Sequence, residues 1–233
     1  MTTSMPSTET TNQDSFIVEM SRQQPAWHVV ILSMLSFSLY LVFWYFKTVK
    51  ALKSKAEAAY GSGVKPGTTS CEGALGKYRN ANPSSQTLML VAPTIIGCFI
   101  PLLMPFLPIS PETIKPLGLL IPIISLGFFG ILYHDIATLA PEGSMLKANP
   151  SFPAFSLVVA MVFFFYFFKL PGAFFLLFTM VSVPAAIAQH WLNNYWERVE
   201  PESAMVRKSY SKGEMLMMLV GSMLLSFIVL GSL

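Results

Sequence analysis

Five polar residues lie near the ends of long apolar stretches, where ionisable and amide side chains are costly to bury. They are His134, Asp135, Gln189, His190 and Asn193. A histidine next to a carboxylate titrates near neutral pH and suits proton or ion binding. These residues predict a candidate polar vestibule for an ion, a proton or a small polar solute. The preferred interpretation, however, is that they cap helix ends and hydrogen-bond between helices among the lipid headgroups.

Metal binding and catalysis are weaker interpretations of the same residues. His134, Asp135 and His190 are suitable ligand types, but adjacent residues on a helix point about 100° apart and cannot both face one ion. We therefore expect no metal and no cofactor. The chain also lacks a nucleophile–base constellation of the Ser/His/Asp or Cys/His kind, which predicts a non-enzymatic protein. An intramembrane enzyme acting on lipid remains a third alternative.

Four lysines follow the first apolar stretch at close spacing: Lys47, Lys50, Lys53 and Lys55. Each basic side chain near an anionic membrane surface contributes about 1 kcal/mol of attraction. They are candidate contacts for anionic lipid, although a role in fixing membrane orientation is the preferred interpretation. The segment has few interleaved aromatic residues, so we expect no nucleic-acid partner.

The composition indicates the class of protein in which these residues occur. Of 233 residues, 53% are apolar and 12% are charged, with a mean hydropathy of +0.56, whereas soluble domains carry about 25% charged residues. A soluble enzyme, an acidic disordered chain and a nucleic-acid-binding domain are therefore excluded. Two cysteines are too few for a disulfide framework.

The apolar stretches predict an all-α fold, a polytopic membrane helix bundle with about six transmembrane helices. A helix needs about 20 apolar residues to cross the hydrocarbon core. The expected single transmembrane domain is 27–233, with spans near 27–46, 88–109, 116–140, 153–168, 173–191 and 215–232. The fourth span is short, and joining it to the fifth would give five crossings.

The distribution of basic residues predicts an orientation. Segments 47–87, 141–152 and 192–214 hold twelve of the 15 lysines and arginines. These segments lie on one side of a six-span arrangement, which is the cytoplasmic side by the positive-inside rule. Both termini are then expected outside the cytoplasm. Five crossings would move the basic residues of 192–214 outside, so the charges favour six.

The segments outside the spans give local predictions. Residues 1–26 are polar and are expected to form a flexible N-terminal tail, and 47–87 is expected to be a basic cytoplasmic loop. The first helix should continue through 47–60 and end at the glycines of 61–63. Ser211 and Glu214 have the spacing of a capping box before the last span.

Three stretches carry a resemblance. They are Phe43-Trp44-Tyr45-Phe46-Lys47, the run Gln189-His190-Trp191-Leu192-Asn193-Asn194-Tyr195-Trp196, and Lys212-Gly213-Glu214 before a helix containing Gly221. With them the chain resembles bacterial multi-helix integral membrane proteins of unknown function that have a Trp-Tyr-x-Lys-like end to the first helix. The resemblance implies a prokaryotic inner (plasma) membrane protein and supplies no activity.

Two functional hypotheses follow from these observations. The leading hypothesis is a non-enzymatic accessory or assembly subunit, with the lipid bilayer and a membrane protein partner or a second copy as its contacts. The alternative is a small transporter or channel that uses the cytoplasm-facing vestibule. Helices interrupted by proline, such as 88–109 with Pro93 and Pro101, are common at transport sites.

Overall fold

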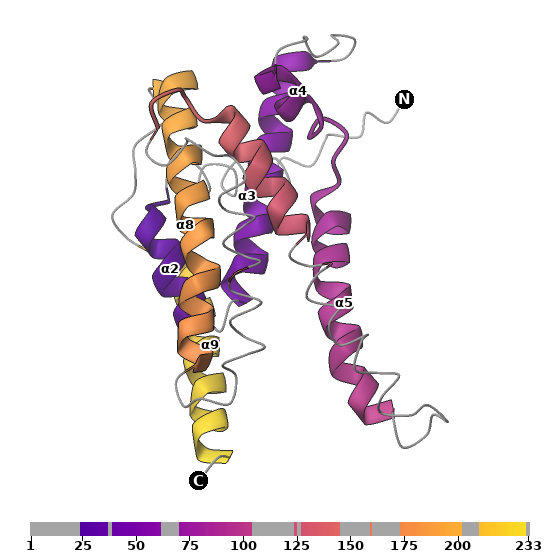
Figure 1. Cartoon of the computed structure of the whole chain (residues 1–233), viewed down its shortest axis with the longest axis vertical. Coiled ribbons are helices and arrows are strands. Elements are labelled where there is room, and N and C mark those ends of the chain that lie inside the picture. Colours follow the sequence, from indigo (N-terminus) through magenta and orange to yellow (C-terminus); the bar gives the residue numbers. More distant parts are fainter. Residues whose placement is uncertain are drawn as a thin grey trace, which may run out of the picture.

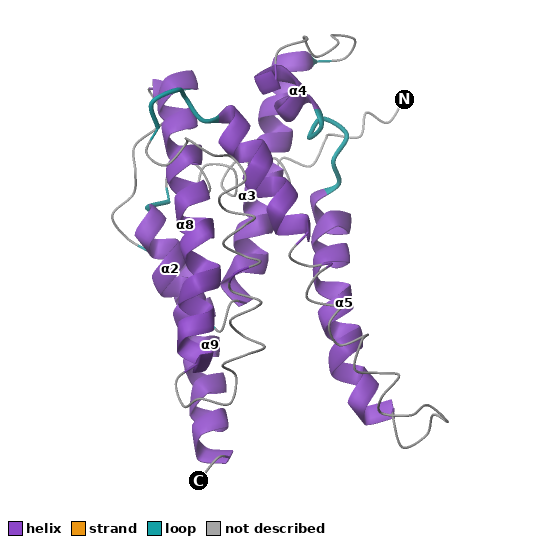
Figure 2. Ribbon diagram, in the orientation of Figure 1, coloured by secondary structure: helices purple, strands orange, loops and turns teal. Residues whose placement is uncertain are grey.

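The fold is all-α in the residues that the structure describes. This computed structural model describes residues 24–36, 39–61, 70–103, 124, 127–144, 159, 173–201 and 210–231, and none of these residues is in a strand (Figures 1 and 2). The helices are α2 (Ala26–Leu35), α3 (Leu39–Tyr60), α4 (Ser70–Gly76), α5 (Pro83–Leu103), α8 (Ala173–Val199) and α9 (Lys212–Gly231). A further helix covers residues 127–139.

The first apolar stretch is divided between two helices. α2 ends at Leu35, and the Ser36 hydroxyl accepts a hydrogen bond from the Tyr40 backbone N–H at 2.9 Å, at the start of α3. Gln24 lies beside Lys47, with Nζ to Oε1 at 2.8 Å, although 23 residues of straight helix would separate them by roughly 35 Å. The two helices therefore fold back on each other as a hairpin, and the prediction of one uninterrupted helix over 27–46 is wrong.

The N-terminal boundary also differs from the prediction. Gln24 and Pro25 are buried and Ala26 begins α2, so the last three residues of the expected flexible tail 1–26 belong to the packed structure. Residues 1–23 lie outside the described residues.

The expected continuation of the first helix is confirmed. α3 runs to Tyr60 and is followed by Gly61 at φ +45°, a conformation that glycine adopts at little cost. The segment 47–87 also contains α4, and the Tyr60 hydroxyl donates to the Glu72 carbonyl at 3.2 Å. α5 contains Pro93 and Pro101 and stands apart from α8 and α9 (Figure 1).

The last helix begins with the predicted capping box. The Glu214 carboxylate accepts the Ser211 N–H at 2.8 Å, and the Ser211 hydroxyl accepts the Glu214 N–H at 3.3 Å. Seven residues further along α9, Gly221 lies directly against the end of α2. A Cβ at this position would be 2.1 Å from the Leu35 carbonyl oxygen. The absence of a side chain at Gly221 therefore allows α9 to approach the hairpin.

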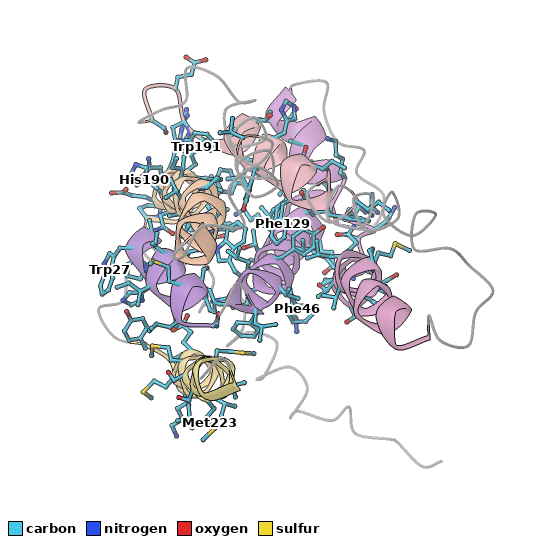
Figure 3. All side chains as sticks on the ribbon, turned by 60° about the horizontal axis from the view of Figure 1, so that its bottom comes forward. Trp27, Phe46, Phe129, His190, Trp191 and Met223 are labelled. Carbon is cyan, nitrogen blue, oxygen red and sulfur yellow. The ribbon has the colours of Figure 1, made fainter. Side chains whose placement is uncertain are left out.

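Large aromatic side chains fill the space between α3, α8 and residues 127–139. Trp44 and Tyr133 are both fully buried, with ring centroids 5.9 Å apart. Phe129 meets Tyr45 edge to face at 5.5 Å and points in among the helices (Figure 3). These contacts pack the first half of α3 against the helix over 127–139.

Among the described residues, no helix has both the length and the hydropathy that crossing a membrane requires. Of the expected spans, 153–168 lies outside the described residues except for Val159, and 116–140 is described only at Ile124 and from Gly127 onward.

Candidate functional site

A buried cluster of four polar side chains joins the hairpin to the last helix. Gln24, Tyr40, Lys47 and Glu214 all have side chains fully removed from solvent, and we call them the anchor cluster. Gln24 precedes α2, Tyr40 and Lys47 come from α3, and Glu214 comes from the first turn of α9. The cluster therefore connects three segments that are far apart in the sequence.

The ammonium group of Lys47 lies among three oxygen atoms of the anchor cluster. Its distances are 2.8 Å to Gln24 Oε1, 3.2 Å to the Tyr40 hydroxyl and 3.5 Å to Glu214 Oε1. Tyr40 also donates to Glu214 Oε1 at 3.1 Å and accepts from Gln24 Nε2. A charged group in an apolar interior must be paired and hydrogen-bonded, and these contacts satisfy both requirements.

A chain of amide hydrogen bonds extends from this cluster into α8. The Asn193 side chain donates to the Gln24 backbone carbonyl at 2.9 Å and accepts from Gln189 Nε2 at 2.7 Å. Gln189 Oε1 in turn accepts the indole N–H of Trp44 at 2.6 Å. Two of the predicted vestibule residues, Gln189 and Asn193, therefore bond to each other and hold α8 against α3 and the start of α2.

Asp135 belongs to a different cluster. Its Oδ1 is 2.6 Å from Lys77 Nζ, and its Oδ2 accepts the Tyr78 hydroxyl at 3.0 Å. The carboxylate is buried, whereas the lysine side chain is 61% exposed. Burial, and then the charge of Asp135, raise the pKa of Tyr78 well above its ordinary value of 10.0. Asp135 thus holds the segment after α4 against the helix over 127–139.

The two predicted vestibule histidines are both exposed. His134 and His190 lie on outer faces of their helices, and Figure 3 shows His190 on the outer side of α8. His190 Nε2 is 3.4 Å from the Asn194 side-chain nitrogen. The five predicted residues are thus divided among an exposed pair, the Asp135 cluster and the amide chain. No group of three or more metal-ligating side chains occurs in the described part of the chain.

The four lysines predicted to contact lipid lie in different environments. Lys47 is fully buried in the anchor cluster, so its prediction as an anionic-lipid contact is wrong; the reversal at Ser36 brings Gln24 over it. Lys55 forms an ion pair with Glu200 at 2.7 Å, and Lys53 one with Glu57 at 3.7 Å. Lys50 is half-buried, with its ammonium 6.0 Å from the Phe46 ring.

Sequence reasoning missed Gln24, Tyr40 and Glu214 as partners of Lys47. The serines at positions 33, 36 and 38 within an apolar stretch could have indicated the chain reversal, because serine is favoured at helix N-termini. Glu214 was identified only as part of a capping box, yet its second carboxylate oxygen faces Lys47.

Comparison with known proteins finds no relative of this chain. No family model, no curated protein sequence and no solved structure matches the chain.

Proposed function

We propose that this chain is a polytopic integral protein of a prokaryotic inner (plasma) membrane, and that it acts as a non-enzymatic accessory or assembly subunit. The first support is a largely apolar interior that also holds buried charges, beneath a surface with many exposed large apolar groups. Such apolar surfaces in a protein mark contact with lipid or with other proteins. The exposed apolar residues of α2 and α9 are Trp27, Ile31, Leu35, Met215, Leu216, Leu219, Val220 and Met223.

The observation that carries the accessory role is the pairing of the buried charges. Lys47, Asp135 and Glu214 are the fully charged side chains that are buried among the described residues. Each has a partner of opposite charge on a different segment: Lys47 pairs with Glu214, and Asp135 pairs with Lys77. Charges that neutralise one another across helices stabilise one arrangement of the bundle. This supports a structural role for these residues.

The assembly role is tested by crosslinking through the exposed face of α9. A photoreactive amino acid replaces Leu219, which is 53% exposed, and a matched control replaces Leu52, which is fully buried. We expect irradiation of intact membranes to give one protein–protein adduct of defined mass at Leu219 and none at Leu52. Native mass spectrometry then distinguishes a second copy from a different subunit. Lipid adducts alone, with a purified monomer, would contradict the assembly role.

A small transporter or channel is the second candidate, and one observation favours it. Hydrogen bonds link Trp44, Gln189 and Asn193 to the backbone carbonyl of Gln24, and the side chain of Gln24 bonds to Lys47 of the Lys47–Glu214 pair. Buried ionisable residues, such as Lys47 and Glu214 here, often mark ion and proton pathways in membrane proteins.

Proteoliposomes loaded with a pH-sensitive dye test this candidate. Acidification that depends on the protein, and that Glu214→Gln abolishes, would favour transport over the accessory role. The control is Glu57→Gln, because Glu57 is exposed and pairs with Lys53 in the preceding turn. Dye signals equal to those of empty liposomes are the result that the accessory role predicts.

A further inference from the structure

The start of α2 lies at the same end of the molecule as the basic segments. Gln24 contacts Lys47 at the head of segment 47–87 and accepts, through its backbone carbonyl, the Asn193 side chain from the end of α8. One turn into α2, the His28 ring stacks on Tyr210, with centroids 4.1 Å apart. Three independent contacts thus place residues 24–28 beside the segments 47–87 and 192–214, which carry eleven of the 15 basic residues.

The hairpin is too short to reach across a bilayer. α2 has ten residues from Ala26 to Leu35, which corresponds to a length of about 14 Å. Along α9, Glu214 lies at the level of Lys47, and Gly221 lies at the level of Leu35 and Ser36. Seven residues of helix rise by about 10 Å. Both measures give a depth well under the roughly 30 Å of a hydrocarbon core.

The outer surface of the hairpin is apolar and ends in basic residues. Trp27, Ile31 and Leu35 are exposed at four-residue spacing along α2, by between 37% and 53%, so they form one stripe. Leu39, the first residue of α3, is also 46% exposed. Trp27 stands at the open end of this stripe, on the outer side of α2 (Figure 3). Tryptophan at such a position is typical of the lipid headgroup level. Half-buried Lys50 and Lys53 follow on α3, where anionic headgroups would complement them.

We propose that residues 24–47 form a re-entrant hairpin that enters and leaves the bilayer through the basic face, and that its apolar stripe contacts the acyl chains of that leaflet alone. This proposal rests on the membrane location proposed above. It places the N-terminal tail on the same side as segments 47–87 and 192–214. A single first span over 27–46 would place the tail on the opposite side.

The side occupied by the N-terminal tail decides between the two arrangements. Cys71 is exposed in α4 and serves as a native reporter for segment 47–87 when Cys98 is replaced by serine. A second variant carries Ser15→Cys with both native cysteines replaced by serine. Each full-length variant is expressed in a bacterial inner membrane and labelled with a membrane-impermeant maleimide, in intact spheroplasts and in inverted vesicles.

The hairpin predicts that Ser15→Cys and Cys71 label together, strongly in inverted vesicles and only after detergent in intact spheroplasts. Labelling of Ser15→Cys in intact spheroplasts beyond that of Cys71 would overturn the hairpin. Alkaline carbonate extraction of the same membranes distinguishes a wrong hairpin from a wrong membrane location. Release of the protein into the soluble fraction contradicts the membrane location itself, whereas a retained protein with its tail on the opposite side contradicts only the hairpin.

Discussion

Lys47 and Glu214 form a pair in which neither charge reaches solvent. The ammonium and carboxylate are 3.5 Å apart, and Gln24 and Tyr40 supply further hydrogen bonds to the lysine. Removing one member of a buried pair leaves an uncompensated charge, which costs much more than removing both. The pair therefore specifies where α9 attaches to the hairpin.

We expect Lys47→Met to lower the free energy of unfolding by about 3–5 kcal/mol, because Glu214 stays buried without its cation. Adding Glu214→Gln, which keeps the capping-box acceptor, should recover part of the loss. Chemical denaturation in mild detergent measures both variants. The control is Lys53→Met, which breaks an exposed i,i+4 pair and should cost about 0.3–0.5 kcal/mol. Losses that simply add in the double variant would show that Lys47 and Glu214 do not interact.

Tyr78 gives a prediction about alkaline pH. Burial, and then Asp135, raise the pKa of Tyr78 well above 10.0, so the folded protein holds the phenolic proton more tightly than the unfolded chain. The stability from this group is complete below pH 10 and is lost as the pH rises beyond it. Melting temperatures measured from about pH 8 to about pH 11 should therefore fall less steeply for Tyr78→Phe than for the unaltered protein. Parallel alkaline slopes would contradict this assignment.

At the scale of the helices, Gly221 controls how closely α9 approaches α2. A Cβ there would be 2.1 Å from Leu35 O and 2.5 Å from Ser36 Cα, both backbone atoms. We expect Gly221→Ala to displace α9 and lower the free energy of unfolding by about 1–3 kcal/mol, the usual cost of overpacking. Gly213→Ala is the matched control, since nothing lies within 4 Å of its added Cβ. Equal unfolding curves for the two variants would show that α9 does not rest on the hairpin.

Local features of these helices were predictable from sequence, because neighbouring residues determine them. The end of α3 at Gly61 follows from glycine at a positive φ, and the start of α9 follows from the spacing of Ser211 and Glu214. The anchor cluster was not predictable in this way. It depends on the reversal at Ser36, which brings Gln24 back to Lys47, and helical periodicity within one stretch carries no information about that reversal.

The grouping of the candidate vestibule residues was also beyond what the sequence pattern could predict. Its five residues were grouped because they occupy one depth in the expected spans, and depth says nothing about the direction in which each side chain points. Asp135 faces Lys77 and Tyr78, while His134 on the preceding position is exposed. Adjacent positions on a helix differ by about 100°, which separates the two environments.

At the scale of the whole molecule, we propose that paired charges lie within a largely apolar bundle whose outer apolar side chains face lipid. α9 presents this contrast within a few turns. Glu214 is fully buried and Met218 packs against the core, whereas Leu216, Leu219 and Met223 are exposed. Figure 3 shows Met223 on the side of α9 that faces away from the other helices. The membrane location that we propose would account for both halves of this distribution.

The most direct measurement is a nitroxide scan of α9 in lipid nanodiscs. Single spin labels at Leu216, Leu219 and Met223 are compared with one at Met218. We expect dissolved oxygen, which concentrates in acyl chains, to relax the first three labels strongly and the label at Met218 weakly. A water-soluble nickel complex should reach none of them. Strong relaxation of the three exposed positions by nickel, with little by oxygen, would place this face in water and contradict the account.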